Sequence, residues 1–440
     1  MLAPYRTALE ADGWSTMSLR QTLTAYFLDA VSAAGAAATL PGRLPRNVPK
    51  GRTIVLGCGK AAAEMARAAR AGLAGEVCGC VVTRYGHGVG QAIEGIDVIE
   101  AGHPVPDAAG LAATEAIIAL AAQAGPDDRV IFLISGGGSA LLCAPAAGLA
   151  FAEKQAMTRH LVRSGAPIEH INLVRRHLSR VKGGRLAALA GARGAELMTY
   201  LISDVVGDDP ALVASGPSIA APFEPEAAIG LLERYGWNTS AEAKAAIRAN
   251  RPDLVSAHRV TTLATGADAL AALRRRAEAD GWSVIDLGAD LRGEASTTGR
   301  EHAAIARNLL GQPGRHLLIS GGELTVSGAT ADGCGGPNLE YLAGVLSGLA
   351  PDDPVAVLAG DSDGIDGTQD NAGGYARAGA ALPEALAKAL AAHRTYALFE
   401  ALGGLVITGP TRTNVNDLRM IAVVGNLQVV SPAGFEPATY

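Results

Sequence analysis

The segment from Val130 to Leu142 constrains the fold of this chain more than any other. A continuous run of apolar residues leads directly into Ser135, three glycines and Ser139. Such a run is typical of a strand that is buried on both faces of a parallel sheet. Glycines at its end let the backbone turn so that successive N–H groups point at an anion, and the N-terminus of a following helix adds positive charge. The segment therefore predicts a strand, an anion-binding loop and a helix.

A second turn of the same kind lies in the other half of the chain, where residues 316–326 read HLLISGGELTV. Two strand–Ser–Gly–Gly turns in different halves predict two anion-binding loops that face one cleft. The alternative interpretation is that both are tight turns after a strand, without any ligand.

Apolar, strand-like runs alternate with longer helix-like segments, which is typical of a parallel sheet with helices on both faces. We therefore predict an α/β fold with a Rossmann-like parallel sheet domain over residues 17–250 and a smaller α/β C-terminal domain over 251–425. The active site is expected in the cleft between them. A length of 440 residues leaves room for two or three domains. Ser18 is predicted to cap the first helix, with residues 1–16 as an upstream extension.

Charge and composition exclude several classes of protein. The net charge is −6, from 37 Lys and Arg against 43 Asp and Glu, and no long basic run occurs. Nucleic acid and anionic membranes are therefore not expected as partners. No uncharged apolar stretch reaches the roughly 18 residues of a membrane span, and the first residues lack the apolar core of a secretory signal. Cysteines without a C-x-x-C pair indicate reduced thiols. We expect a cytoplasmic protein with small-molecule ligands.

The segment GCGKAA at residues 57–62 follows a predicted strand and opens a predicted helix. It fits G-x-G-x-x-A, a weak dinucleotide-binding signal, although Arg84 rather than an acidic residue ends the next strand. It lacks the spacing of a Walker A loop. A lysine in the first turn of a helix opposes the helix dipole, so Lys60 indicates a bound anion such as a phosphate group. The alternative is a solvated surface lysine.

Basic residues are concentrated between Asn172 and Leu186. If two or three of them reach the cleft, they can hold a phosphate or a carboxylate; the alternative is a solvated helix face. We assign substrate or phosphate binding to four residues, three from this run and one from the second glycine turn: Arg180, Lys182, Arg185 and Glu323.

Carboxylates stand at two further positions that suit chemistry. Asp204 ends a predicted buried strand, where catalytic groups are expected in an open α/β sheet, and it can accept a hydroxyl proton or hold Mg²⁺. Residues 361–367 read DSDGIDG, which is not the spacing of an EF-hand. Asp363 and Asp366 are candidate magnesium ligands, and the alternative is that both belong to tight turns.

These motifs together resemble one family, the glycerate 2-kinases of the MOFRL type. The resemblance runs from about Leu19 to Val424, in the order GCGKAA, GHPVPD, LISGGGSALL, RRHLSRVKGGRLA, SDVVGDDPALVASGPS, GGELTV, DGIDG and GPTRTNVNDL. It implies transfer of the γ-phosphoryl group of ATP to the 2-hydroxyl of D-glycerate, giving 2-phosphoglycerate, with Mg²⁺ as cofactor. A homodimer is compatible with the resemblance.

The resemblance also implies residue roles. The catalytic lysine of the family corresponds to Lys60 and its catalytic aspartate to Asp204. Its nucleotide loop corresponds to Gly136, Gly137, Gly138 and Ser139. Where the family often has Gly-Gly-Arg-Asn-Gln-Glu, Pro337 and Leu339 replace the arginine and the glutamine, which predicts a change in phosphate affinity or acceptor. Two alternatives stay open: an NADP-dependent hydroxypyruvate reductase, and a non-catalytic protein that binds nucleotide or sugar acid.

The end of the chain differs from the rest. Residues 426–440 contain GFEPATY, which is what one reading frame of a transfer-RNA T-arm encodes. We predict a disordered tail produced by read-through past the natural stop.

Overall fold

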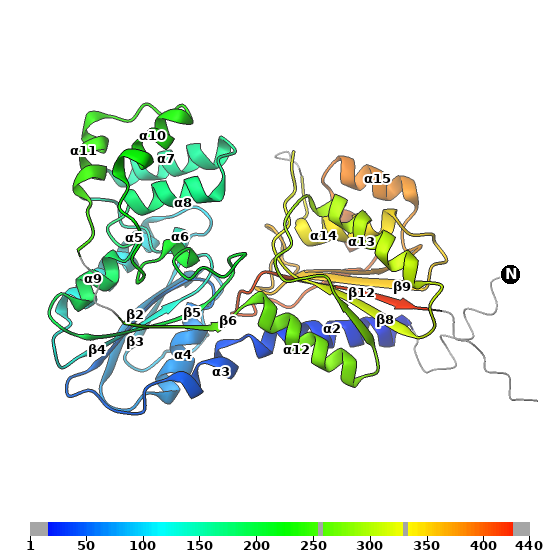
Figure 1. The fold of residues 1–440 in the computed structure, drawn as a ribbon, viewed down its shortest axis with the longest axis horizontal. Coiled ribbons are helices and arrows are strands. Elements are labelled where there is room, and N and C mark those ends of the chain that lie inside the picture. The colour runs from blue at the N-terminus through cyan, green and yellow to red at the C-terminus, as the bar shows by residue number, and fades with distance from the viewer. Residues whose placement is uncertain (1–15, 254–257, 329–332, 426–440) are drawn as a thin grey trace, which may run out of the picture.

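The computed structural model describes residues 16–253, 258–328 and 333–425. Two lobes lie side by side, and each is built on a six-stranded sheet (Figure 1). The predicted tail at 426–440 lies outside the described residues, as does the upstream segment before Thr16.

The first lobe confirms the predicted Rossmann-like sheet. All its strands are parallel, and their order, β3-β2-β1-β4-β5-β6, is that of a doubly wound dinucleotide-binding fold. Every residue of the two central strands β1 and β4 is buried, which explains their unbroken apolar sequences. The strands are β1 (Thr53–Cys58), β2 (Val77–Arg84), β3 (Ile96–Ala101), β4 (Arg129–Ile134), β5 (Glu196–Ile202) and β6 (Arg259–Ala264).

Helices cover both faces of this sheet (Figure 1). On one face lie α3 (Ala36–Thr39) and α4 (Ala62–Gly72), and on the other α5 (Ala108–Gln123), α6 (Gly138–Leu141) and α9 (Arg185–Gly191). A further helical layer with its own apolar core sits above the second face. It consists of α7 (Phe151–Arg163), α8 (Ile168–His177), α10 (Pro225–Arg234) and α11 (Ala241–Ala249).

The second lobe confirms a smaller α/β unit, but its sheet is mixed. The strand order is β11-β10-β9-β12-β8-β7, and all neighbours are antiparallel except β7 and β8. The strands are β7 (Ser283–Asp286), β8 (Arg315–Ser320), β9 (Val355–Asp361), β10 (Gly373–Arg377), β11 (Leu405–Val406) and β12 (Asp417–Val424). The helices are α2 (Thr16–Ala33), α12 (Gly266–Ala279), α13 (Ala295–Leu309), α14 (Pro337–Ser347), α15 (Pro383–Ala391) and α16 (Thr395–Ala401).

The two sheets divide the chain differently from the predicted boundary near residue 250. Strand β6 pairs with β5 and so belongs to the first sheet. Helix α2 lies under the second sheet beside α12 (Figure 1), and its Leu23 and Phe27 are fully buried there. The helix begins at Thr16, so Ser18 lies inside it and is not its cap. Local sequence patterns specify an element but not the sheet on which it packs, which explains the difference.

A single apolar cluster runs through both lobes. It joins residues of β1, α4 and β5 in the first lobe with residues of α2, α12 and β9 in the second. In the described part of the chain, no single helix is long and apolar enough to cross a membrane. The segments Leu19–Ala33 and Ala36–Arg43 are long and apolar enough only when they are taken together, and the chain bends between them. Their buried apolar side chains belong to the cluster that joins the lobes.

Candidate active site

A cavity of about 430 Å³ opens between the two lobes. Its first-lobe wall comes from the loop after β4, from α8 and from the loop after β5. Its second-lobe wall comes from the segments around residues 292 and 324. The lining residues are Gly137, Ser139, Glu169, Asn172, Arg175, Asp204, Val205, Val206, Leu212, Ala214, Arg292, Gly293, Glu323 and Thr325.

The first glycine loop, after β4, forms part of the cavity wall. Gly137 has a φ of 79°, which favours glycine. A side chain at Gly136 would collide with the Asp204 carboxylate, because a Cβ there would lie 1.9 Å from Oδ2. Within the described residues, the N–H groups of Gly136 and Gly137 donate to no acceptor. The helix predicted after this loop is the four-residue α6, so the free N–H groups, not a long helix dipole, make the loop suitable for an anion.

The second glycine turn, after β8, differs from the first. The N–H of Gly321 donates to the carbonyl of Gly288, and the carbonyls of Gly321 and Gly322 accept hydrogen bonds from the buried Arg419. No helix follows it directly. These contacts favour the interpretation as a tight turn, and the turn carries Glu323 into the cavity.

Lys60 lies directly behind Gly137 and is paired across the two lobes. Its Nζ is 2.5 Å from Oδ2 of Asp363, and its backbone N–H donates to the carbonyl of Gly136 at 2.8 Å. Burial by itself lowers the pKa of Lys60, but the carboxylates of Asp363, Asp361 and Asp204 raise it above its usual value. Lys60 is therefore a fixed, paired ammonium group beside the glycine loop and not a surface lysine, although it does not itself line the cavity.

Asp204 stands just beyond the end of β5, where the sequence predicts it, and lines the cavity. Its Oδ2 accepts a hydrogen bond of 3.0 Å from Nδ2 of Asn414, a residue of the second lobe. Burial raises the pKa of Asp204, while the charge of Lys60 opposes that shift. A carboxylate with a raised pKa, held at the cavity wall, is suited to accept a proton.

Glu323 faces the same cavity from the second lobe. Its surroundings raise its pKa through burial and through the carboxylates of Asp204 and Asp417. The sequence predicts that Glu323 binds substrate or phosphate. Because a carboxylate repels a phosphate group, Glu323 is better suited to accept a hydrogen bond from a hydroxyl group of the substrate.

The three basic residues assigned to substrate binding do not line the cavity. Arg180 is exposed and pairs with Glu115. Lys182 is buried and its Nζ donates to the carbonyl of Ala214 at 3.3 Å. Arg185 donates to the carbonyls of Asn250 and Lys182. The helix that would present them ends at His177, so these residues follow a different path from the one that helical spacing implies.

The structure brings other residues to the site instead. Asn172 and Arg175, from the same basic run, line the cavity from α8. His103, from the GHPVPD motif, lies beside Gly137, and burial together with the cations Lys60 and Arg84 lowers its pKa to about 3, so it is neutral. In the sequence, Asn172 and Arg175 are indicated by the basic run, and His103 by the GHPVPD motif. Spacing alone does not say which members of the run point inward.

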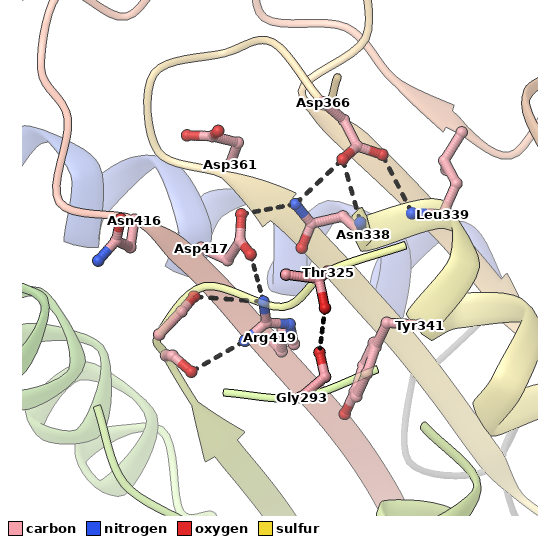
Figure 2. Close-up of polar contacts among 12 residues, drawn as sticks. Gly293, Thr325, Asn338, Leu339, Tyr341, Asp361, Asp366, Asn416, Asp417 and Arg419 are labelled. Atoms are coloured by element: carbon pink, nitrogen blue, oxygen red, sulfur yellow. Dashed lines mark hydrogen bonds and ion pairs between the residues drawn. The ribbon is translucent and has the colours of Figure 1, made fainter. Parts of the chain in front are cut away.

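The predicted magnesium ligands do not fit a metal site. Asp363 pairs with Lys60 and accepts from the N–H of Ile365. Both carboxylate oxygens of Asp366 accept hydrogen bonds, each of 3.0 Å, from the N–H groups of Asn338 and Leu339 at the start of α14 (Figure 2). Throughout residues 16–253, 258–328 and 333–425, no three His, Cys, Asp or Glu side chains are grouped to hold a metal ion.

The network around Asp366 continues into the second sheet. Asn338 donates through Nδ2 to Oδ1 of Asp417 at 2.7 Å, and Asp417 pairs with Arg419 (Figure 2). The two departures from the family pattern lie beside this network. Pro337 is the first residue of α14 and Leu339 is fully buried in the core of the second lobe. Neither residue lines the cavity, so the departures do not alter its walls directly.

Known proteins resemble this chain over nearly its whole length. A model of the MOFRL family matches residues 316–417, and a model described as a domain of unknown function, DUF4147, matches residues 22–249. A D-glycerate 2-kinase of Thermotoga maritima is 37% identical over 379 residues, which cover 83% of this chain and 89% of the relative.

Two further matches bear on the family. A protein of Agrobacterium vitis named "Putative hydroxypyruvate reductase" is 40% identical over 429 residues, covering 93% of this chain and 96% of that protein. The crystal structure of a glycerate kinase from Thermotoga maritima matches with a TM-score of 0.81 and 33% identity, covering 93% of this chain and 100% of the other. Sequence and fold agree, and the chain belongs to the MOFRL family of glycerate 2-kinases.

Proposed function

We propose that the protein is an ATP-dependent kinase that phosphorylates the 2-hydroxyl of D-glycerate. The products are 2-phosphoglycerate and ADP. The observation that carries this proposal is the glycine loop with free N–H groups, which lies beside Lys60 and Asp204 at the cavity between the lobes. The similarity to glycerate kinases of Thermotoga maritima supports the choice of acceptor.

The residues have separate roles in the proposed transfer. In the loop from Gly136 to Ser139, the free N–H groups of Gly136 and Gly137 bind phosphate oxygens of the nucleotide. Asp204 accepts the proton of the acceptor's 2-hydroxyl group. The hydroxyl oxygen then bonds to the γ-phosphorus of ATP, while the bond between the γ-phosphorus and the bridging oxygen breaks and ADP leaves. The ammonium of Lys60 stabilises the charge on the phosphoryl group in transit. Glu323 hydrogen-bonds a hydroxyl group of the acceptor.

Mg²⁺ is proposed only as the ion that accompanies the polyphosphate, because Mg²⁺ usually takes most of its ligands from phosphates and water. We also propose a cytoplasmic location, which cysteines without a C-x-x-C pair favour, and a homodimer.

The name of the Agrobacterium vitis relative favours one other function, an NADP-dependent reductase of hydroxypyruvate. The sequence support for it is the G-x-G-x-x-A spacing at 57–62 with Arg84 after the second strand. A third hypothesis, a sensor that binds nucleotide and sugar acid without catalysis, shares the same cavity.

One set of assays separates the three functions. ADP release is measured with D-glycerate, L-glycerate and related sugar acids, and NMR of the product identifies the phosphorylated carbon. We expect ADP only in the presence of D-glycerate, with the phosphate on carbon 2. NADPH oxidation with hydroxypyruvate would identify the reductase, and binding of both ligands without ADP release would identify the sensor.

A further inference from the structure

The charges around the cavity are distributed unevenly. On one side, the ammonium of Lys60 is surrounded by three carboxylates, those of Asp363, Asp361 and Asp204. The charge of Lys60 is therefore already paired with Asp363 before any ligand arrives. An anionic ligand needs a second source of positive charge, on another wall.

The wall formed by α8 carries such a charge. Arg175 lines the cavity together with Ser139 of the glycine loop. In the part of the chain that the structure describes, the guanidinium of Arg175 makes no ion pair and no hydrogen bond. Burial lowers its pKa, and no carboxylate acts in the opposite direction.

Two buried lysines lie close enough to Arg175 to feel its charge. Lys154 donates to the carbonyls of Cys143 and Ala144, and Lys182 donates to the carbonyl of Ala214, which also lines the cavity. Burial is the main cause that lowers the pKa of Lys154 to about 7 and of Lys182 to about 8, and Arg175 adds to both shifts.

Among the residues that the structure describes, none of these three cations forms an ion pair, although the carboxylate of Glu169 also lines the cavity. The thiols nearest to the lysines are those of Cys58 and Cys143, and burial raises the pKa of both, so they carry no charge near neutral pH. Buried cations without a counterion are strongly unfavourable for the folded state. An anion bound against Arg175 reduces the free-energy cost of burying this positive charge. That reduction favours binding of the anion and is independent of Lys60.

We propose that Arg175, backed by Lys154 and Lys182, forms the oxyanion-binding side of the cavity. The proposal rests on the proposed function and adds the residue that anchors the anion. The planar guanidinium binds a carboxylate or a phosphate through two parallel hydrogen bonds. The oxyanion belongs either to the carboxylate of the acceptor or to the phosphates of the nucleotide.

Calorimetric titration with ATP, D-glycerate and inorganic pyrophosphate tests this site. We compare the wild-type protein with Arg175→Ala, with Arg175→Lys, and with Arg159→Ala as a control on the exposed face of α7. Loss of Arg175 should weaken binding of the oxyanion about 10- to 100-fold, the effect of losing a charged hydrogen bond. Arg175→Lys keeps the charge, preserves folding, and should recover only part of the affinity.

Each result has one meaning. Weaker binding of D-glycerate alone identifies the carboxylate as the oxyanion, and weaker binding of ATP and pyrophosphate identifies the phosphates. If both Arg175 variants bind all three ligands as the control does, the site is overturned, even when the wild type is an active glycerate kinase. If the wild type releases no ADP but Arg175→Ala loses pyrophosphate binding, the proposed function fails and the anion site stands.

Discussion

At the scale of single residues, Lys60 connects the first glycine loop, through the carbonyl of Gly136, with Asp363 of the second lobe. Lys60→Ala should lower kcat on the order of 10²–10³-fold, as expected for a preorganised group that stabilises transition-state charge. The measurement is steady-state ADP release by variant protein whose circular dichroism matches that of the wild type. The control is Lys50→Ala, because Lys50 is exposed.

Removal of Lys60 also leaves Asp363 without its partner, which destabilises the folded protein. The thermal unfolding of the variant is therefore measured beside its activity. A folded Lys60→Ala protein with near-normal turnover would contradict the catalytic assignment.

Asp204 predicts a pH dependence. Its pKa lies above the usual value because it is buried, so the ionised form that accepts a proton is lost as pH falls through that raised pKa. The wild-type kcat should therefore decline on the acidic side. Asp204→Asn should lower kcat about 10²–10⁴-fold and abolish this decline.

The control for Asp204→Asn is Asp209→Asn, an exposed residue of the same loop whose side chain accepts from the N–H of Ala211. An acidic limb that persists unchanged in Asp204→Asn would assign proton transfer to another group, with Glu323 as the next candidate.

At the scale of secondary-structure elements, α2 is an N-terminal helix that stabilises the second lobe. Phe27 is fully buried against that sheet, whereas its neighbour Leu28 is 42% exposed. Phe27→Ala should lower the free energy of unfolding by about 3–5 kcal/mol, because it removes the aromatic side chain and leaves a cavity.

Urea denaturation measures this loss, with Leu28→Ala as the matched control. The control should change stability by about 0.5 kcal/mol or less, as a surface substitution does. Equal effects of the two substitutions would mean that α2 does not pack on the second sheet in this way.

Helix α14 shows why some elements escape prediction from the sequence. Its residues from Asn338 to Leu346 are all buried, so no polar face alternates with an apolar one. The helical period that identifies amphipathic helices is therefore absent. Its N-terminus is held by Asp366, a contact between residues 28 positions apart in the chain that spacing alone does not indicate.

At the scale of the whole molecule, stability depends on pH through the buried Lys154. Its pKa falls from 10.5 when unfolded to about 7 in the folded protein, mainly through burial. Between these two values the unfolded chain binds more protons, so stability rises with pH. Below about pH 7 the cost of the buried charge is present in full.

Lys154→Met should therefore differ from the wild type in a pH-dependent way. The free energy of unfolding of the wild type, relative to the variant, should increase between about pH 7 and pH 10 by at most about 1.4 kcal/mol per pH unit. Urea denaturation across that range provides the measurement. A difference that does not change with pH would show that Lys154 is not a buried titrating group.

The sequence by itself determined the class of the fold and predicted where the candidate site lies. Unbroken apolar runs specify strands buried on both faces, and the glycines after β4 specify a turn in which the N–H groups of Gly136 and Gly137 stay free. Lys60 and Asp204 could be proposed as site residues because a charge at a helix start or at the end of a parallel strand is informative without knowledge of distant contacts.

Only the tertiary structure decided which sheet receives β6 and α2, and which basic residue of the run from Asn172 to Leu186 reaches the cavity. It also decided that the carboxylate of Asp366 accepts hydrogen bonds from the N–H groups at the start of α14. The physical reason is the same in each case. Local patterns fix the conformation of a segment, whereas the direction of a side chain and its partners depend on how segments distant in the chain pack together.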